Sequence, residues 1–175
     1  MIIDRRSFVA TGVLGSGALA IPSFGHAAAV GDLRGFTHAV ASGEPSGESV
    51  LLWTRYVPAD GGPVTLQVEV AETADFTRVL GGGAQVTGPW RDHTAKITVA
   101  GLRPGRTYHY RFVAPDGGFS PVGRTRTLPD DGARQWRAAI FSCSNLGFGY
   151  FNAYGHAAAR EDLDCAIHLG DYLYE

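Results

Sequence analysis

Short apolar stretches separated by turns occupy the chain from residue 32 to residue 130. Several of them alternate apolar and polar residues, as a strand does when one face of its sheet is buried. Gly-rich turns such as "ADGGP", "GGGAQ" and "PDGG" lie between the stretches. The pattern predicts strands at residues 36–43, 49–57, 64–71, 75–83, 93–102, 107–114 and 120–128.

Strands of this number and length are typical of a two-sheet β-sandwich. In "GLRPGRTYHY", Leu102 precedes a turn at Pro104 and Gly105, and Tyr108 then opens a strand. This arrangement resembles the tyrosine corner of fibronectin type III and immunoglobulin-like domains. Trp53 lies in the middle of its predicted strand, where we expect its ring to fill the space between the sheets.

The pattern changes after a polar, turn-prone linker at residues 131–136. "RAAIFSCSN" is a continuous apolar run that ends in small polar residues. "YFNAYGHAAARED" places Phe151, Tyr154 and Ala158 on one helical face, and "LDCAIHLGDYLYE" is a second apolar run. The pattern of residues 137–175 therefore predicts a βαβ unit of a parallel sheet whose strands are covered on both sides.

Both predicted parallel strands end in residues with metal-binding chemistry. The first contributes Cys143, and the second contributes Asp171, Tyr172 and Tyr174. A right-handed crossover would place the strands side by side or one strand apart, so that their tips meet in one crevice. Ligands bind at this edge of open α/β sheets, which makes it the candidate site.

Each of these residue types suits a metal centre that acts on phosphate. A carboxylate has two oxygens and can bridge two cations, whereas a thiol is deprotonated by the metal that it binds. A tyrosine phenolate points to an acidic ion such as ferric iron, in preference to calcium or magnesium. Two cations roughly 3.5–4 Å apart could hold a phosphate and activate a water between them.

Taken one at a time, the same residues have structural explanations. Cys143 alone would be a small buried hydrophobic residue, and Tyr172 and Tyr174 would be packing aromatics. His168 is expected to be a hydrogen-bonded core histidine, Cys165 to be structural, and His156 to lie at the surface or in packing. The combination of residues, not any single one, indicates the metal site.

The N-terminus has the features of an export signal. An Arg5-Arg6 pair is followed by a mildly apolar run that ends near Ile21 and by small residues at 27–29. The run is too short and too rich in glycine, alanine and serine to span a membrane, and the paired arginines resemble the twin-arginine signal. We expect residues 1–29 to engage the twin-arginine export machinery, leaving a periplasmic or secreted protein without a stable membrane anchor. The alternative is an ordinary secretory signal or a basic N-terminal helix.

Composition and net charge argue against several other classes of protein. The chain is 45% hydrophobic and 18% charged, which excludes a disordered charged tail. Its net charge of −2 gives no electrostatic reason to expect nucleic acid as a specific partner. Two cysteines do not make a disulfide framework.

Four stretches of the chain carry a resemblance to a known family. They are "FTHAVASGEPSGESVLLWTR", "GLRPGRTYHYRF", "VGRTRTLP" and "FSCSNLGFGYFNAYGHAAAREDLDCAIHLGDYLYE", the last being the most specific. In this order they resemble the PhoD-like alkaline phosphatases (alkaline phosphatase D), which are metallophosphoesterases. With the twin-arginine-like signal, the resemblance spans essentially the whole chain.

The resemblance implies a β domain followed by an α/β domain. A fibronectin III or immunoglobulin-like sandwich would occupy residues 32–130, and residues 137–175 would begin a calcineurin-like phosphoesterase domain. The family hydrolyses phosphate monoesters and diesters outside the cytoplasm with ferric iron and calcium, so small phosphate esters are the expected substrates.

The resemblance also implies roles for three residues. Cys143 would ligate iron, Asp171 would bridge iron and calcium as the catalytic residue, and Tyr174 would supply the iron-bound phenolate, whereas Tyr172 inherits no role. The other family ligands, which are Asn, Asp and His residues of later loops, have no counterpart before Glu175. We therefore expect a truncated chain that is inactive by itself.

Two alternatives stay open at this point. A purple acid phosphatase also joins a fibronectin-like domain to a calcineurin-like one and uses a tyrosine three residues after an aspartate. That family places an aspartate where this chain has Cys143. The other alternative is an exported binding module whose working part is the sandwich; its one chemically mixed patch, residues 90–93, is expected to be a solvated turn.

Overall fold

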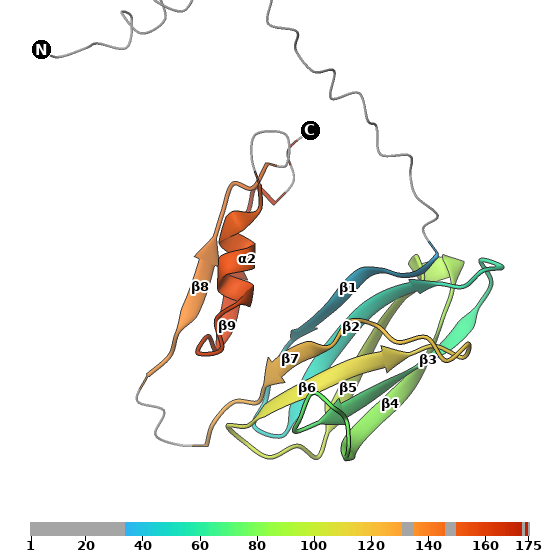
Figure 1. Cartoon of the computed structure of the whole chain (residues 1–175), viewed down its shortest axis with the longest axis horizontal. Helices are drawn as coiled ribbons and strands as arrows, with labels where there is room; N and C mark the ends of the chain where they lie inside the picture. The colour runs from blue at the N-terminus through green and yellow to red at the C-terminus, as the bar shows by residue number, and fades with distance from the viewer. Residues whose placement is uncertain (1–33, 131–134, 146–149, 173, 175) are drawn as a thin grey trace, which may run out of the picture. The chain divides into compact units, whose positions relative to one another are not determined.

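The computed structural model describes residues 34–130, 135–145, 150–172 and 174. The predicted signal peptide and most of the predicted linker lie outside these residues. Every predicted strand of the first region is present (Figure 1), as β1 (Gly35–Gly43), β2 (Ser49–Val57), β3 (Val64–Ala71), β4 (Val79–Thr87), β5 (Thr94–Ala100), β6 (Thr107–Val113) and β7 (Gly123–Arg126).

The strands form two antiparallel sheets, with orders β1-β2-β5 and β4-β3-β6-β7. β4 begins four residues later than predicted, because Asp75 organises a turn before it. The Asp75 carboxylate accepts hydrogen bonds from the Thr73 hydroxyl at 2.6 Å and from the Thr77 backbone N–H at 3.1 Å. A short 3₁₀ helix, η1 (Pro89–Arg91), leads into β5.

The core lies between the two sheets and follows the two-residue period of the strands. Its members are Val50, Leu52, Tyr56, Leu66, Val68, Val70, Ala95, Ile97, Val99, Leu102, Tyr108, Tyr110, Phe112 and Ala114. The prediction for Trp53 was wrong. Even-numbered residues of β2 face the core, so Trp53 lies on the outer face, paired with Ala41 and Lys96 in the neighbouring strands and only partly buried.

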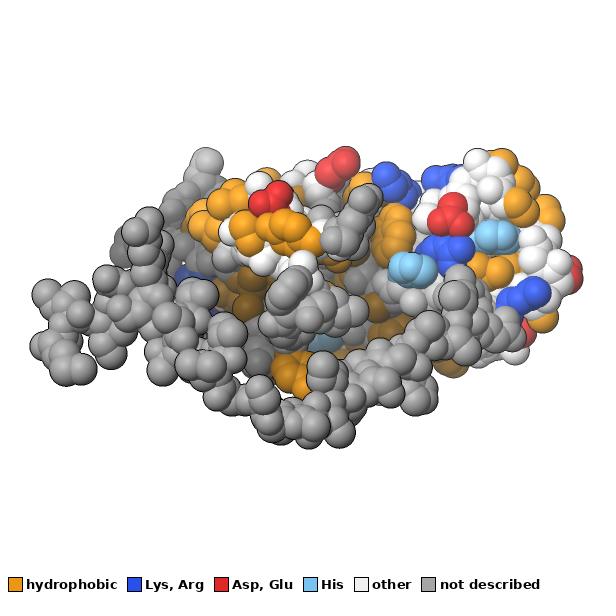
Figure 2. Space-filling view, turned by 90° about the horizontal axis from the view of Figure 1, so that it is seen from above, with side chains coloured by type: hydrophobic (Ala, Val, Ile, Leu, Met, Phe, Trp, Pro, Cys, Tyr) orange, Lys and Arg blue, Asp and Glu red, His pale blue; other side chains and the backbone are white. Residues whose placement is uncertain are grey.

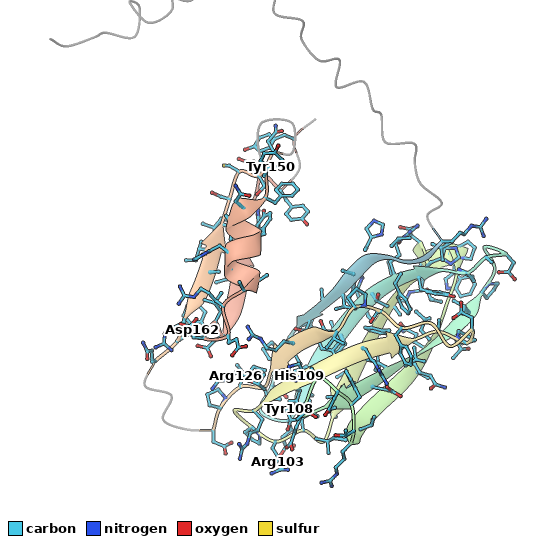
Figure 3. All side chains as sticks on the ribbon, in the orientation of Figure 1. Arg103, Tyr108, His109, Arg126, Tyr150 and Asp162 are labelled. Atoms are coloured by element: carbon cyan, nitrogen blue, oxygen red, sulfur yellow. The ribbon has the colours of Figure 1, made fainter. Side chains whose placement is uncertain are left out.

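The tyrosine corner is present as predicted. The Tyr108 hydroxyl accepts a hydrogen bond from the Arg103 backbone N–H at 2.9 Å, and Tyr108 is 1% exposed. Both residues lie at the same end of the sandwich (Figure 3). The bond satisfies a backbone donor of the turn before β6 and ties that turn to the core.

Residues 90–93 form a turn of mixed character. Trp90 is 66% exposed, and Asp92 makes an exposed ion pair with Arg55 at 2.8 Å, as in a solvated turn. His93 departs from that expectation, because it is buried at 8% exposure.

The second region contains the predicted βαβ unit: β8 (Ala138–Phe141), α2 (Asn152–Ala158) and β9 (Cys165–His168). β8 and β9 pair directly and in parallel, from Ala138 opposite Cys165 to Phe141 opposite His168. α2 runs alongside this pair (Figure 1), and its Tyr154 ring packs against Phe141 at 4.7 Å between centroids.

Two details of this unit differ from the prediction. α2 ends at Ala158, and Arg160 and Asp162 form an ion pair at 2.7 Å in the turn that follows. The strands are not covered on both sides by described residues, since Ile140 is 62% exposed and Ile167 36% exposed. Figure 2 shows hydrophobic side chains at the surface beside charged ones. Within the described ranges, no helix has the length and apolar character needed to cross a membrane.

Candidate metal centre

The loops after β8 and β9 are hydrogen-bonded to each other. The Leu169 N–H donates to the Phe141 carbonyl at 2.8 Å, continuing the parallel ladder past the strand ends. Beyond it, the Cys143 N–H donates to the Gly170 carbonyl at 3.2 Å, and the Ser144 N–H donates to the Asp171 carbonyl at 3.0 Å. The two loops therefore form one unit at the edge of the sheet where a ligand site was predicted.

Both candidate ligands at the loop tips have left-handed backbone conformations. Cys143 has φ 58° and Asp171 has φ 52°, and Gly170 between β9 and Asp171 has φ 118°. A left-handed conformation at a residue other than glycine costs on the order of 1–3 kcal/mol and is common at functional sites. The cross-loop hydrogen bonds offset this cost by holding both tips in place.

The structure brings together the three side chains that the family resemblance implied as metal ligands. The Cys143 thiol donates to Oδ2 of Asp171 at 3.4 Å. The Tyr174 hydroxyl is hydrogen-bonded to both Cys143 and Asp171. A sulfur, a carboxylate and a phenolic oxygen thus meet at one point, and Tyr174 remains 46% exposed.

The electrostatics of this cluster favour a cation. The hydrogen bond with Cys143 raises the pKa of Tyr174 well above its usual value, and desolvation and the Asp171 carboxylate raise it further. A bound cation reverses this effect, because positive charge stabilises the phenolate, the thiolate and the carboxylate together. The donor set therefore fits a metal cation.

One of the three donors of this cluster is a tyrosine. Across the residues that the structure describes, no three histidine, cysteine, aspartate or glutamate side chains gather as a metal-binding group. Cys143 and Asp171 supply two donors, and Tyr174 is the third.

The other residues considered from the sequence lie outside the cluster. Tyr172 is 67% exposed and packs edge-on against His168 at 5.1 Å between centroids. His156 is exposed, as expected, and Cys165 is half-buried at the start of β9. His168 is hydrogen-bonded, as expected, but it is half-buried instead of lying in a core.

Two side chains, Tyr154 and Ser144, support the loops through contacts that the sequence does not predict. Tyr154 Oη lies 2.8 Å from His168 Nε2 and is also hydrogen-bonded to Ser144 Oγ. Helical periodicity identified the packing face that includes Tyr154, but it carries no signal for what the hydroxyl reaches.

A cluster of charged residues lies at the other end of the βαβ unit. Asp162 and Tyr150 are at opposite ends of α2 (Figure 3). The hydrogen bond from Arg160 lowers the pKa of Asp162 to about 2, and Asp164 accepts a hydrogen bond from the Arg137 N–H at 2.9 Å. These pairs hold the start of β8 to the turn before β9 and are separate from the candidate metal centre.

Comparison with known proteins matches both regions of the chain. The family profile described as "PhoD-like phosphatase, N-terminal domain" matches residues 20–129, and that described as "PhoD-like phosphatase" matches residues 138–175. Alkaline phosphatase D of Bacillus subtilis (strain 168) is 41% identical over 149 residues, which are 80% of this chain and 25% of that protein.

The three-dimensional comparison agrees with the sequence comparison. A solved structure of PhoD matches with a TM-score of 0.74 and 38% identity, over 81% of this chain and 28% of that one. The chain thus spans about a quarter of the length of these relatives. This match confirms the fold class predicted from the sequence. The chain belongs to the PhoD-like phosphatase family.

Proposed function

We propose that the protein carrying the whole phosphatase domain hydrolyses small phosphate esters with the help of ferric iron and calcium. The observation that carries this proposal is the meeting of Cys143, Asp171 and Tyr174 at the ends of two parallel strands. The similarity to a protein named alkaline phosphatase D supports the same activity.

Each residue of the cluster has one part in holding the cations. Cys143 would bind iron as a thiolate and Tyr174 as a phenolate, whereas Asp171 would place its carboxylate between iron and calcium. When bound, the cations supply positive charge that offsets the charge developing on the attacking and leaving oxygens of the ester. Cys143 and Tyr174 are both hydrogen-bonded to Asp171, so the chain orients the Asp171 carboxylate before any substrate arrives.

The activity is proposed for the whole protein. Residues 1–175 span about a quarter of the relatives they match, and they supply three ligand side chains from two loops. In a protein with the whole phosphatase domain, further ligands would complete the coordination of both cations.

Metal analysis and kinetics of the protein with its whole phosphatase domain test this function. We expect iron and calcium to copurify, p-nitrophenyl phosphate to be hydrolysed, and activity to fall on chelation and return on re-addition of both ions. Undiminished turnover by protein shown to be free of both metals would reject the proposal.

Export is the second part of the proposed function. We propose that residues 1–29 direct the protein through the twin-arginine route to the periplasm or the exterior. Changing Arg5→Lys together with Arg6→Lys should leave the protein in the cytoplasmic fraction, because that route reads the paired arginines. Unchanged export of the double variant would indicate an ordinary secretory signal instead.

A further inference from the structure

A row of three side chains joins the two ligand loops through α2. Tyr154, on the helix, is hydrogen-bonded to Ser144 in the first loop and to His168 Nε2 at 2.8 Å. The Gly170 backbone N–H donates to His168 Nδ1 at 3.2 Å. The row therefore begins beside Cys143 and ends beside Asp171.

The hydrogen bonds in this row have one consistent direction. A backbone N–H can only donate, so His168 Nδ1 is the acceptor from Gly170, and a neutral imidazole then carries its proton on Nε2. Nε2–H donates to Tyr154 Oη, which leaves the phenolic proton for Ser144 Oγ. Tyr154 and His168 each donate one hydrogen bond and accept one, so the row runs without a break from the Gly170 N–H to Ser144 Oγ.

The row adds a constraint that the backbone bonds between the loops do not provide. Those bonds tie the Cys143 and Ser144 N–H groups to the carbonyls of Gly170 and Asp171, and so hold the two loops to each other. They do not by themselves fix the two loops relative to α2. Tyr154 removes that freedom, because its ring packs on Phe141 at 4.7 Å and on Phe151 at 5.5 Å between centroids. Its hydroxyl is thus held where the two loops meet.

We propose that Tyr154 is a positioning residue for the candidate metal centre. Its hydroxyl couples Ser144 to His168, and this coupling holds the Cys143 and Asp171 loops at the separation at which they bind metal. The proposal rests on the proposed function, since it concerns the same metal centre. Outer residues that orient metal ligands typically change metal affinity by roughly 10- to 100-fold when they are altered.

The test is Tyr154→Phe in the protein with its whole phosphatase domain. This variant keeps the ring that packs on Phe141 and removes only the hydroxyl. Tyr150→Phe is the matched control, because it makes the same chemical change at a side chain that is 89% exposed. Ferric ion is titrated into metal-free protein and followed by the phenolate-to-iron absorption, and hydrogen exchange of residues 141–145 is measured by mass spectrometry without metal.

For Tyr154→Phe we expect ferric affinity to fall roughly 10- to 100-fold and the absorption band at saturation to shift. We also expect the Cys143 and Ser144 amides to exchange about tenfold faster, because their partners lie on a loop that has lost its support. Tyr150→Phe should match the wild type in all three measurements. Ser144→Ala should add little to Tyr154→Phe, whereas Ser144→Thr, which keeps the hydroxyl, should retain affinity.

The outcomes separate this inference from the proposed function. Iron binding and exchange in Tyr154→Phe equal to those in Tyr150→Phe would overturn the positioning role and leave the metal centre standing. A wild type that binds no ferric ion would reject the metal centre, whereas faster exchange in Tyr154→Phe would still support the positioning role. If circular dichroism shows that Tyr154→Phe does not fold, Ser144→Ala is used instead. It breaks the same row at Ser144 and is judged by the same criteria.

Discussion

The thiol sulfur of Cys143 lies 3.4 Å from Oδ2 of Asp171, although 28 positions separate the two residues in the sequence. Parallel pairing causes this contact, because Phe141 opposite His168 brings the following loops to the same edge of the sheet. Tyr174 completes the cluster through its hydrogen bonds to both residues.

Asp171→Asn should remove most of the activity of the protein with its whole phosphatase domain, together with one or both metals. An amide offers one oxygen and an NH₂ donor, so it cannot bridge two cations as a carboxylate does. We expect kcat on p-nitrophenyl phosphate to fall by more than the roughly 100-fold that an outer residue can cost.

Asp162→Asn is the control for that experiment. It makes the same change in the turn after α2, where Asp162 forms exposed ion pairs with Arg137 and Arg160, and such pairs contribute little to stability. Turnover and metal content should both stay at the wild-type level. Normal turnover by Asp171→Asn would contradict the assignment of Asp171.

Cys143→Asp tests whether sulfur ligates the iron. The substitution converts the first loop to the residue type that purple acid phosphatases place there, and it should change the iron absorption and lower activity because a thiolate donor is lost. Absorption spectra and kcat check this, with Cys165→Ser at the start of β9 as the matched thiol control. Full activity in Cys143→Asp would count against thiolate ligation.

Tyr108→Phe should destabilise the sandwich by about 1–3 kcal/mol, the cost of leaving a buried backbone donor without a partner. The lost bond is the one from the Arg103 N–H at 2.9 Å, at a side chain that is 1% exposed. Urea denaturation followed by tryptophan fluorescence measures the difference. Tyr150→Phe should denature as the wild type does, and an equally stable Tyr108→Phe would show that water replaces the tyrosine.

Alkaline pH should destabilise the sandwich through Tyr56. Desolvation and the hydrogen bond to Asp116 raise the pKa of Tyr56 from 10.0 to about 12. Because the folded state holds this proton more tightly, the stabilisation is fully present below pH 10 and is lost as pH rises toward about 12. Denaturation midpoints between pH 9 and pH 12 should therefore fall less steeply in Tyr56→Phe than in the wild type.

Tyr172→Phe is the control for the alkaline series, since Tyr172 is 67% exposed. It should show the same pH dependence as the wild type. A slope in Tyr56→Phe identical to that of the wild type would assign the alkaline loss to other groups, of which Tyr110 is the first candidate. Burial raises the pKa of Tyr110 to about 12 as well.

Local patterns predicted most of the elements, because each pattern reports on a short segment. The turn before Tyr108 and the alternation in β3, β5 and β6 mark their strands without reference to the rest of the chain. The residue types after β8 and β9 indicated Cys143, Asp171, Tyr172 and Tyr174 as candidates, since parallel strands must end at a common edge, and the family resemblance then selected Tyr174 over Tyr172.

Tertiary contacts decided what these patterns leave open. In β2, apolar residues occupy both faces around Trp53, so only packing against the other sheet selects which face is buried. The row from Ser144 through Tyr154 to His168 likewise depends on how far α2 stands from the two loops. Periodicity in a sequence fixes directions within one element, whereas hydrogen bonds between side chains of different elements depend on distances that only the packed chain sets.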